Sequence, residues 1–398
     1  MLKPYTRSSE LPQYDLYIVE LTAGGHRTTF LRYLVEHAVS KELSVCIATL
    51  QSTIDSQSFC EFEVPLEPLV LPDYLSWIPR IGTSSFVNQL RVYFGVRRFL
   101  SSVNPKRGIV FPTLQATGAI PLGLFGSGYC HSWSGVLMAP AAHLRNYSID
   151  SHHSKLELAI QKFAYMRMIR DNKCMRLSSF DVLFSDWMGS SKVVSCPDPV
   201  ELKSNYELIG KEFLDLEITN KVLVVVAGTI DKRKKIPRLA RAILSLDSES
   251  FHLLVVGSVK DLNQIESEEF KKLLIANKAT VISRRLSDTE IDFSFSIADV
   301  LWSGNDRTYG SSGAVVRGGA HGKPVITMYG SVMSEMMRAA GGGPIIDMTS
   351  ETEITAVLKM LESEDVRKKY GESNKSIFGD NTTQKYAATV LAPLLDHV

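Results

Sequence analysis

Hydrophobic and polar positions alternate in blocks along the chain. Short runs of apolar, often β-branched residues are followed by longer stretches in which apolar residues recur at helical spacing. Near the start, YDLYIVEL (residues 14–21) predicts a strand and TTFLRYLVEHAVSK (residues 28–41) predicts a helix. This alternation is typical of parallel sheets covered by helices, so the pattern predicts an α/β fold.

The same pattern predicts two such units. After an ill-defined stretch with two prolines (residues 195–213), continuous apolar runs restart the alternation, which favours a crossing between domains there. Strands are expected at 43–50, 108–112, 128–131 and 181–188 in the first half and at 221–230, 251–259, 279–283, 298–302, 324–328 and 344–348 in the second. Helices are expected at 237–246, 354–379 and 384–398.

We therefore predict two Rossmann-like domains. The first covers residues 1–195 and the second covers 196–375, and a C-terminal helix over residues 376–398 is expected to pack back on the first. In open parallel sheets, ligands bind beyond the carboxyl ends of the strands, so the prediction includes a ligand cleft between the domains.

Composition narrows the class of protein. Of 398 residues, 44% are apolar and 22% charged, with a net charge of +1, which lacks the basic excess of a dedicated nucleic-acid binder. The five cysteines are widely spaced without a CxxC pair, which favours free thiols in a reducing compartment. No apolar signal region opens the chain and no segment has the length of a membrane span, so a cytoplasmic protein is expected.

Several familiar motifs are missing from the sequence. No G-x-G-x-x-G follows the first strand, and the glycine pair at Gly24 lacks the G-K-[ST] ending of a P-loop. No G-x-S-x-G elbow and no H-E-x-x-H occurs. Redox dinucleotide, ATP, serine hydrolase and zinc protease functions are therefore disfavoured.

A basic loop follows the first strand of the second half. VLVVVAGTIDKRKKIPRL (residues 222–239) places Gly228 at the strand end, before Lys232, Arg233, Lys234 and Lys235. Cations at such a strand end can neutralise a diphosphate, whereas most charge runs are solvated turns. We favour a functional role for Lys234 and a solvated position for Lys232.

The stretch YGSSGAVVRGGAHGKP (residues 309–324) holds little side chain. A helix starting near Ala314 would leave the amides of Ser311, Ser312 and Gly313 at its N-terminus, where anions bind. The same residues would also be expected without a ligand, as a serine N-cap followed by glycines that allow close packing. Because a basic loop stands at the end of a neighbouring strand, a phosphate site is the favoured interpretation.

These two stretches resemble a known family. The donor-site region of retaining GT-B glycosyltransferases, especially glycosyltransferase family 4, is similar to the stretch FSFSIADVLWSGNDRTYGSSGAVVRGGAHGKPVITMYGSVMSEMM. That family's strand and basic loop resemble AGTIDKRKKI. The likeness covers most of residues 220–375; in the first half it rests on AGGH and GYCHSWSG. It implies the GT-B fold and transfer of a sugar from a nucleotide diphosphate to a glycan or lipid-linked acceptor, in polysaccharide or glycoconjugate biosynthesis.

The resemblance also implies roles for residues of this chain. Lys234 matches the lysine that holds the donor diphosphate, and His131 matches a histidine near the donor sugar and the bond being made. Gly24 and Gly25 match a first-domain loop under the diphosphate. The other residues implied to bind the donor are Gly228, Thr229, Arg233, Arg284, Asp306, Tyr309, Gly310, Ser311, Ser312, Gly313 and Arg317.

The chain departs from the family pattern at charged positions. Tyr309 and Arg317 stand where the family has two glutamates, and Asp306 is the candidate to accept from a donor hydroxyl instead. Thr229 stands at the arginine of the phosphate pair, which leaves Arg233, Arg307 or Arg317 to replace it. The resemblance thus implies a divergent subfamily or a chain that has lost catalysis.

Several mechanisms stay open on the sequence. In the retaining reaction, Lys234, arginine and helix amides stabilise the departing diphosphate, which itself takes the acceptor proton. In the inverting alternative, His26 is the general base. A non-catalytic nucleotide-sugar or glycan binder and a sugar-nucleotide epimerase are further alternatives.

Two smaller expectations concern cofactors and membranes. No isolated Asp-x-Asp follows a strand, so the nucleotide sugar is expected as co-substrate without a metal or other cofactor. Residues 86–107 mix arginine and lysine with aromatic and aliphatic residues, as surface helices beside anionic lipid do. Peripheral contact with the inner face of the membrane is a hypothesis for this segment, and a helix packed on its own sheet is the alternative.

Overall fold

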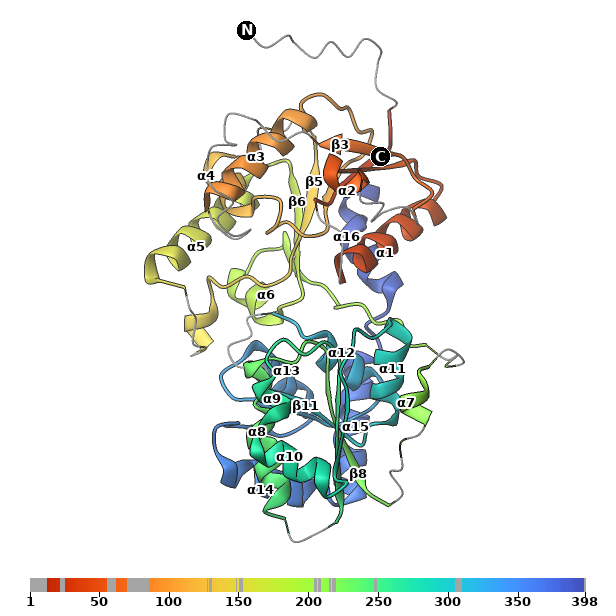
Figure 1. Ribbon diagram of the computed structural model, residues 1–398. Coiled ribbons are helices and arrows are strands. Elements are labelled where there is room, and N and C mark those ends of the chain that lie inside the picture. The colour runs from red at the N-terminus through yellow and green to blue at the C-terminus, as the bar shows by residue number, and fades with distance from the viewer. Residues whose placement is uncertain are drawn as a thin grey trace. The chain divides into compact units, whose positions relative to one another are not determined.

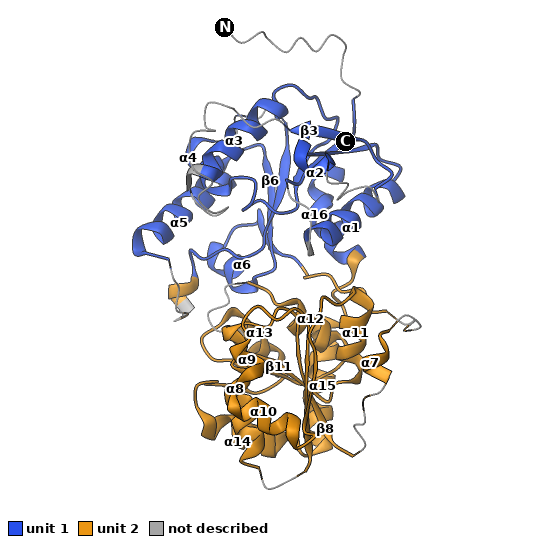
Figure 2. Ribbon diagram, in the orientation of Figure 1, with its two compact units in different colours: residues 1–143, 153–196, 384–398 blue, residues 144–152, 197–383 orange. Residues whose placement is uncertain are grey.

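A computed structural model of the chain contains two compact units, each built on one parallel sheet (Figures 1 and 2). It describes residues 13–21, 26–55, 62–69, 86–126, 128, 131–147, 149, 153–203, 206, 209–214, 216, 220–246, 249–304 and 310–396. Unit 1 comprises residues 1–143, 153–196 and 384–398, and unit 2 comprises 144–152 and 197–383. The predicted α/β class with two parallel sheets is confirmed.

Among the described residues, the sheet of unit 1 has seven strands in the order β3-β2-β1-β4-β5-β6-β7. Its strands are β1 (Leu16–Val19), β2 (Val45–Leu50), β3 (Leu66–Leu69), β4 (Gly108–Phe111), β5 (Trp133–Leu137), β6 (Cys174–Ser179) and β7 (Val193–Ser195). Its helices are α1 (His26–Ser40), α2 (Gln51–Asp55), α3 (Phe86–Leu100), α4 (Ala119–Phe125), α5 (Lys155–Arg170), α6 (Val182–Met188) and α16 (Thr383–Leu395).

Both faces of this sheet are buried, which explains its continuous apolar runs. In β1, Tyr17 and Val19 face a core that also contains residues of α3, α4 and α5. Leu16 and Ile18 face the opposite core, which contains residues of α1 and α16. Successive side chains of a strand point to opposite faces, so a strand covered on both sides must be apolar at every position.

The C-terminal helix α16 packs on unit 1. The ring of Tyr386 lies 5.6 Å from the ring of Phe30 and 6.0 Å from that of Phe180, measured between centroids. Arg107 Nη1 donates to the carbonyl of Leu395 at 2.9 Å. This terminal segment starts later than the 376 expected from the sequence, because α15 (Glu364–Phe378) continues beyond that position in unit 2.

In the described part of unit 2, the sheet has six strands in the order β10-β9-β8-β11-β12-β13. These are β8 (Val222–Ala227), β9 (Phe251–Val256), β10 (Ala279–Ile282), β11 (Val300–Ser303), β12 (Val325–Met328) and β13 (Ile345–Ile346). The helices are α7 (Lys211–Leu214), α8 (Ile236–Leu244), α9 (Asn263–Glu266), α10 (Glu268–Ile275), α11 (Asp288–Ile297), α12 (Gly313–Ala320), α13 (Val332–Ala340), α14 (Glu351–Leu361) and α15, with single 3₁₀ turns η2 (Leu144–Tyr147) and η3 (Lys232–Lys234). Each strand expected in the second half is present.

The prediction of a strand over residues 181–188 was wrong, because this segment is the helix α6. Asp181 caps it by accepting from the amide of Phe184 at 3.3 Å, and Gly189 ends it in the left-handed conformation. The buried Phe184 and Met188 are four residues apart, which is helical spacing. The strand expected at 128–131 is found instead at Trp133–Leu137, while Tyr129 and Cys130 lie outside the described residues.

Candidate functional site

The sheet of unit 2 changes its direction of growth between β8 and β11. From β8 the chain proceeds through β9 to β10 on one side, whereas β11, β12 and β13 extend the sheet on the other. Loops that leave the carboxyl ends of two such strands diverge, and ligands of open parallel sheets bind in the crevice between them. The two loops in question contain the basic stretch after β8 and the Gly-rich stretch after β11.

The loop after β8 is shaped by a glycine and a capping aspartate. Gly228 has φ +98°, a backbone conformation that favours glycine, and Thr229 after it is exposed. Asp231 caps η3 by accepting from the amide of Arg233, and it also binds the guanidinium of Arg233 through contacts of 2.7–3.1 Å. Arg233, which the sequence suggested as a phosphate ligand, is therefore paired within its own loop.

Lys234 differs from its basic neighbours in being buried. Its side chain is only 5% exposed, whereas Lys232 and Arg233 are exposed. Among the described residues, none forms an ion pair or hydrogen bond with its ammonium group. Burial, reinforced by the positive charge of Arg233, lowers the pKa of Lys234 to about 8. An anionic ligand would stabilise a buried cation in this position.

The two loops are in direct contact beside Lys234. Trp302 of β11 donates its indole N–H to the carbonyl of Lys234 at 2.7 Å. Gly304 follows β11 closely, and a Cβ atom at this position would lie 2.6 Å from the same carbonyl oxygen. Only a residue without a side chain allows the backbones to approach this way. The loop that holds Lys234 is thereby fixed against the strand that leads to α12.

The Gly-rich loop ends at the N-terminus of α12, which begins at Gly313, one residue before the predicted start. The hydroxyl of Ser311 donates to the carboxylate of Asp198. Ser312 is the N-cap residue and is 8% exposed, but its side chain makes no capping hydrogen bond. The first amides of an α-helix lack intrahelical acceptors, so α12 presents donors next to a loop in contact with Lys234. Gly310 lies in this loop, and residues 305–309, with the candidates Asp306 and Tyr309, lie outside the described residues.

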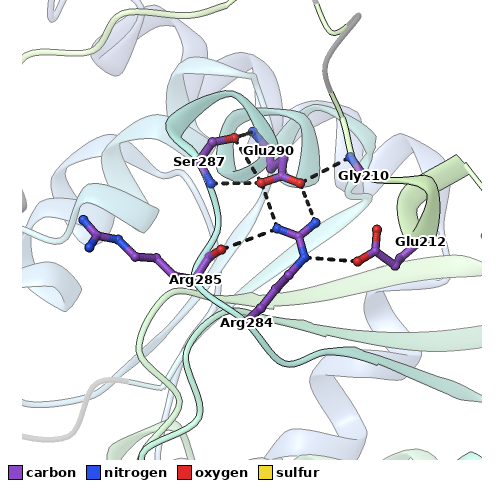
Figure 3. Close-up of polar contacts among 6 residues, drawn as sticks. All are labelled: Gly210, Glu212, Arg284, Arg285, Ser287 and Glu290. Carbon is purple, nitrogen blue, oxygen red and sulfur yellow. Dashed lines mark hydrogen bonds and ion pairs between the residues drawn. The ribbon is translucent and has the colours of Figure 1, made fainter.

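Arg284 belongs to a network of ion pairs (Figure 3). Its guanidinium donates to Glu290 at 2.5 and 3.0 Å and to Glu212 at 3.1 Å. Glu290 also accepts from Ser287 and from the amide of Gly210, and it holds α11 by a capping box. The guanidinium of Arg284 lowers the pKa of Glu290 to about 2. Arg284, two residues after β10, therefore joins residues 210–212 to α11.

Arg317 is also engaged inside unit 2. It lies on α12, 9% exposed, with Nη1 3.8 Å from Oδ1 of Asp288 at the start of α11. Beside it, His321 Nε2 lies 2.9 Å from Oδ1 of the buried Asp292. These contacts join α12 to α11.

His131 lies at the amino edge of the unit 1 sheet. His131 precedes β5. Its ring is hydrogen-bonded to the backbone of Val103, which precedes β4, and it lies near Lys173, which precedes β6. Ligands of parallel sheets bind at the opposite, carboxyl edge. The suggestion that His131 lies beside the bond being made is therefore corrected. Gly24 and Gly25, and the side chain of His26, lie outside what the structure describes.

Two buried polar pairs at the carboxyl edge of unit 1 were not singled out from the sequence. Thr113, just after β4, donates to Glu20, just after β1, at 2.5 Å. His143 Nε2 lies 2.9 Å from Oδ2 of Asp181, and all four residues are at most 2% exposed. Glu20 directly follows an apolar strand run, and this signal could have identified it.

The described residues contain neither a metal-ligand cluster nor a membrane-spanning helix. Over the described part of the chain, no group of three or more His, Cys, Asp or Glu side chains could hold a metal ion. Within the same residues, no helix combines the length and the apolar character needed to cross a membrane.

Comparisons with known proteins place this geometry in context. Residues 211–377 match the family model of glycosyl transferases group 1. A comparison with curated protein sequences finds no match.

Similar solved structures cover nearly the whole chain. Sucrose-phosphate synthase from Thermosynechococcus elongatus is 12% identical, with a TM-score of 0.67 over 96% of this chain and 98% of that one. Anabaena Alr3699/HepE in complex with UDP is 12% identical, with a TM-score of 0.64 over 96% and 100%. WaaG, a glycosyltransferase of lipopolysaccharide biosynthesis, is 15% identical, with a TM-score of 0.62 over 94% and 99%. These structures show that the chain shares their fold, and the family match covers residues 211–377, less than half of the chain.

Proposed function

We propose that the protein transfers a sugar from a nucleotide-diphosphate donor to a hydroxyl group of a glycan or lipid-linked acceptor. The observation that supports this proposal is the ammonium group of Lys234, which is buried at the switch point of the unit 2 sheet and forms no ion pair with a described residue. A diphosphate is a ligand that suits such a site. Anabaena HepE, a protein of similar fold, has been solved with UDP and with UDP-glucose, so uridine nucleotides are the first donors to test.

The proposed mechanism is electrostatic. The bond between the sugar C1 and the diphosphate oxygen breaks, and the leaving group takes the electron pair. Lys234 and the first amides of α12 stabilise the negative charge that grows on the diphosphate. The acceptor oxygen bonds to C1 on the same face, and its proton passes to the departing phosphate. This route retains the configuration and needs no nucleophile or metal ion from the protein. The inverting route with His26 as base is the alternative.

Non-catalytic binding of a nucleotide sugar is the second candidate function. It is favoured by the side chains Tyr309 and Arg317 at the two positions where family 4 enzymes carry glutamate, and by the pairing of Arg317 with Asp288. A binder of this kind keeps the diphosphate site but does not break the sugar bond.

The test compares binding with turnover. Thermal-shift measurements with UDP, GDP, ADP, CMP and dTDP are expected to show stabilisation by at least one nucleoside diphosphate. Lys234→Ala is expected to lose this shift, while Lys232→Ala, which removes an exposed cation two residues away, is expected to keep it. Absence of any shift for the wild-type protein would refute the diphosphate site. Release of nucleoside diphosphate from nucleotide sugars separates an enzyme from a binder.

Peripheral contact with the cytoplasmic face of a membrane is proposed for the α3 side of unit 1. Phe94 of α3, Phe125 of α4 and Phe163 of α5 are 37%, 56% and 54% exposed, and Arg97 and Arg98 end α3. Exposed aromatic rings with nearby cations suit an anionic lipid surface. Flotation with vesicles containing phosphatidylglycerol at low salt tests this; recovery of all the protein in the unbound fraction would contradict it.

A further inference from the structure

Unit 1 contains a cavity of its own at the carboxyl edge of its sheet. The cavity has a volume of about 420 Å³ and is lined by residues of α3, α4 and α5 and by the segments that follow β4 and β5. Parallel sheets place ligands at this edge, and ligand pockets of small molecules start at about 300 Å³. The cavity therefore has the place and the size of a binding site.

One amide that lines this cavity is open to it. Gln161 of α5 lines the cavity and is 8% exposed. Its carboxamide forms no hydrogen bond with any residue that the structure describes, and its atoms stay accessible from the cavity. An amide offers two donors and an acceptor, so a ligand that both donates and accepts satisfies it.

A second amide in the cavity has a fixed orientation. The Oε1 atom of Gln115 accepts from the backbone amides of Met138 at 2.8 Å and Ala139 at 3.1 Å. Because both partners are donors, the oxygen must face them and the NH₂ group must point the other way. There it is bonded to the phenol of the buried Tyr165, which also lines the cavity. The polar lining on this side is thus rigid.

The charged groups of the lining are already paired. Glu157 accepts from the amide of Ser154 at 2.6 Å as part of the capping box of α5, and His153 Nδ1 lies 4.0 Å from its carboxylate. The remaining lining side chains are apolar or neutral, including Ile120, Leu124 and Ile160. Because no unpaired cationic side chain is found among the described lining residues, the cavity does not favour a phosphate or a carboxylate. Because it also contains amide groups, a purely hydrocarbon ligand would leave them without hydrogen bonds.

We propose that this cavity binds an uncharged sugar ring, with Gln161 as the residue that recognises adjacent hydroxyl groups. A pyranose combines apolar C–H faces with hydroxyls that donate and accept, which matches apolar side chains beside an unpartnered amide. Resting on the proposed function, this identifies the acceptor as a neutral glycosyl unit, so that the acceptor is recognised by its sugar and not by a phosphate group.

The test uses the full-length protein and neutral methyl glycosides. Saturation-transfer NMR with the methyl α-glycosides of glucose, galactose, mannose and N-acetylglucosamine is expected to show binding of at least one of them, while glucuronate and octanoate give no signal at the same concentration. Gln161→Leu is expected to weaken that binding at least tenfold. Lys162→Leu places the same side chain on the exposed face of α5 and is expected to leave the binding unchanged.

A second measurement guards against misfolding. Because Gln161→Leu removes an amide that forms no hydrogen bond with the described residues and keeps a side chain of similar size, its melting temperature without ligand should stay close to that of the wild type. Saccharide binding that survives Gln161→Leu, or octanoate binding in place of every glycoside, would overturn the proposal.

The nucleotide thermal shift separates this proposal from the proposed function. If a nucleoside diphosphate stabilises the protein through Lys234 but no glycoside binds, the sugar site is refuted and the donor site stands. If glycosides bind through Gln161 but no nucleotide binds, the cavity is a sugar site of a protein with another activity.

Discussion

Lys234 differs from the neighbouring basic residues in how far its side chain is buried. Four consecutive basic residues follow Asp231, yet only Lys234 is buried, because the turn of η3 directs it into unit 2 while Lys232 and Arg233 face solvent. A buried ammonium that forms no direct ion pair costs stability. Function and stability therefore make opposite demands on this position.

The pKa of Lys234 gives this cost a pH dependence. Folding lowers it from 10.5 to about 8, so between these pH values the unfolded chain binds more protons than the folded protein. The free energy of unfolding should therefore rise as the pH increases from 7 to 10.5, by on the order of 3 kcal/mol relative to Lys234→Met. Urea denaturation of both proteins across this range measures it, with Lys232→Met as control. A difference that does not change with pH would contradict the burial of the ammonium group.

Glu290 gives a second pH dependence of stability, at acid pH. The guanidinium of Arg284 lowers its pKa to about 2, so the stabilisation is complete above pH 4.5 and is lost as the pH falls toward 2. Glu290→Gln should cost about 1–2 kcal/mol at pH 7, because it weakens the ion pair and the capping box of α11. Urea denaturation at pH 7 and pH 2.5 should show the cost shrinking at the lower pH. Glu335→Gln, in an exposed pair with Arg338, should change stability little at either pH.

At the residue scale the sequence predicts some of the site. Lys234 could be named because a cation after a buried strand suits a diphosphate. The role of Arg233 could not be anticipated, because its pairing with Asp231 depends on the cap of η3. His131 was misplaced because a resemblance in GYCHSWSG does not reveal that β5 starts only at Trp133, which leaves the histidine before the strand.

At the scale of elements, long apolar runs were the reliable signal. The strands of unit 2 are buried on both faces and are apolar throughout, so each could be predicted. Strand β6 (CMRLSS) has polar positions and was missed, and its neighbour α6 was assigned as the strand instead. Short helices with few apolar residues resemble strands when only the number of apolar residues is considered.

The packing of α16 is tested by one aromatic residue. Tyr386 is fully buried between Phe30 of α1 and Phe180 after β6. Tyr386→Ala should destabilise unit 1 by about 3–5 kcal/mol, because it removes a large ring from a packed core. Tyr386→Phe keeps the ring and should lose much less. Urea denaturation followed by circular dichroism measures both variants, and equal losses would show that ring packing is not the main contribution.

At the scale of the whole molecule, each unit has its own core and sheet. Calorimetry of the full chain should therefore resolve two unfolding steps. UDP or the preferred nucleotide is expected to raise the step of unit 2, which contains Lys234, and Tyr386→Ala to lower the step of unit 1. A single step that moves with both perturbations would show that the units unfold together.

The position of α16 has a consequence for biosynthesis. Unit 1 contains the earliest strand of the chain, yet part of its core is supplied by residues 384–396, which the ribosome makes after every strand of unit 2. Domains usually mature in the order of their synthesis. In this protein all strands of unit 2 are made before the core of unit 1 is complete, so the apolar surface that α16 covers has no partner until residues 384–396 have been made.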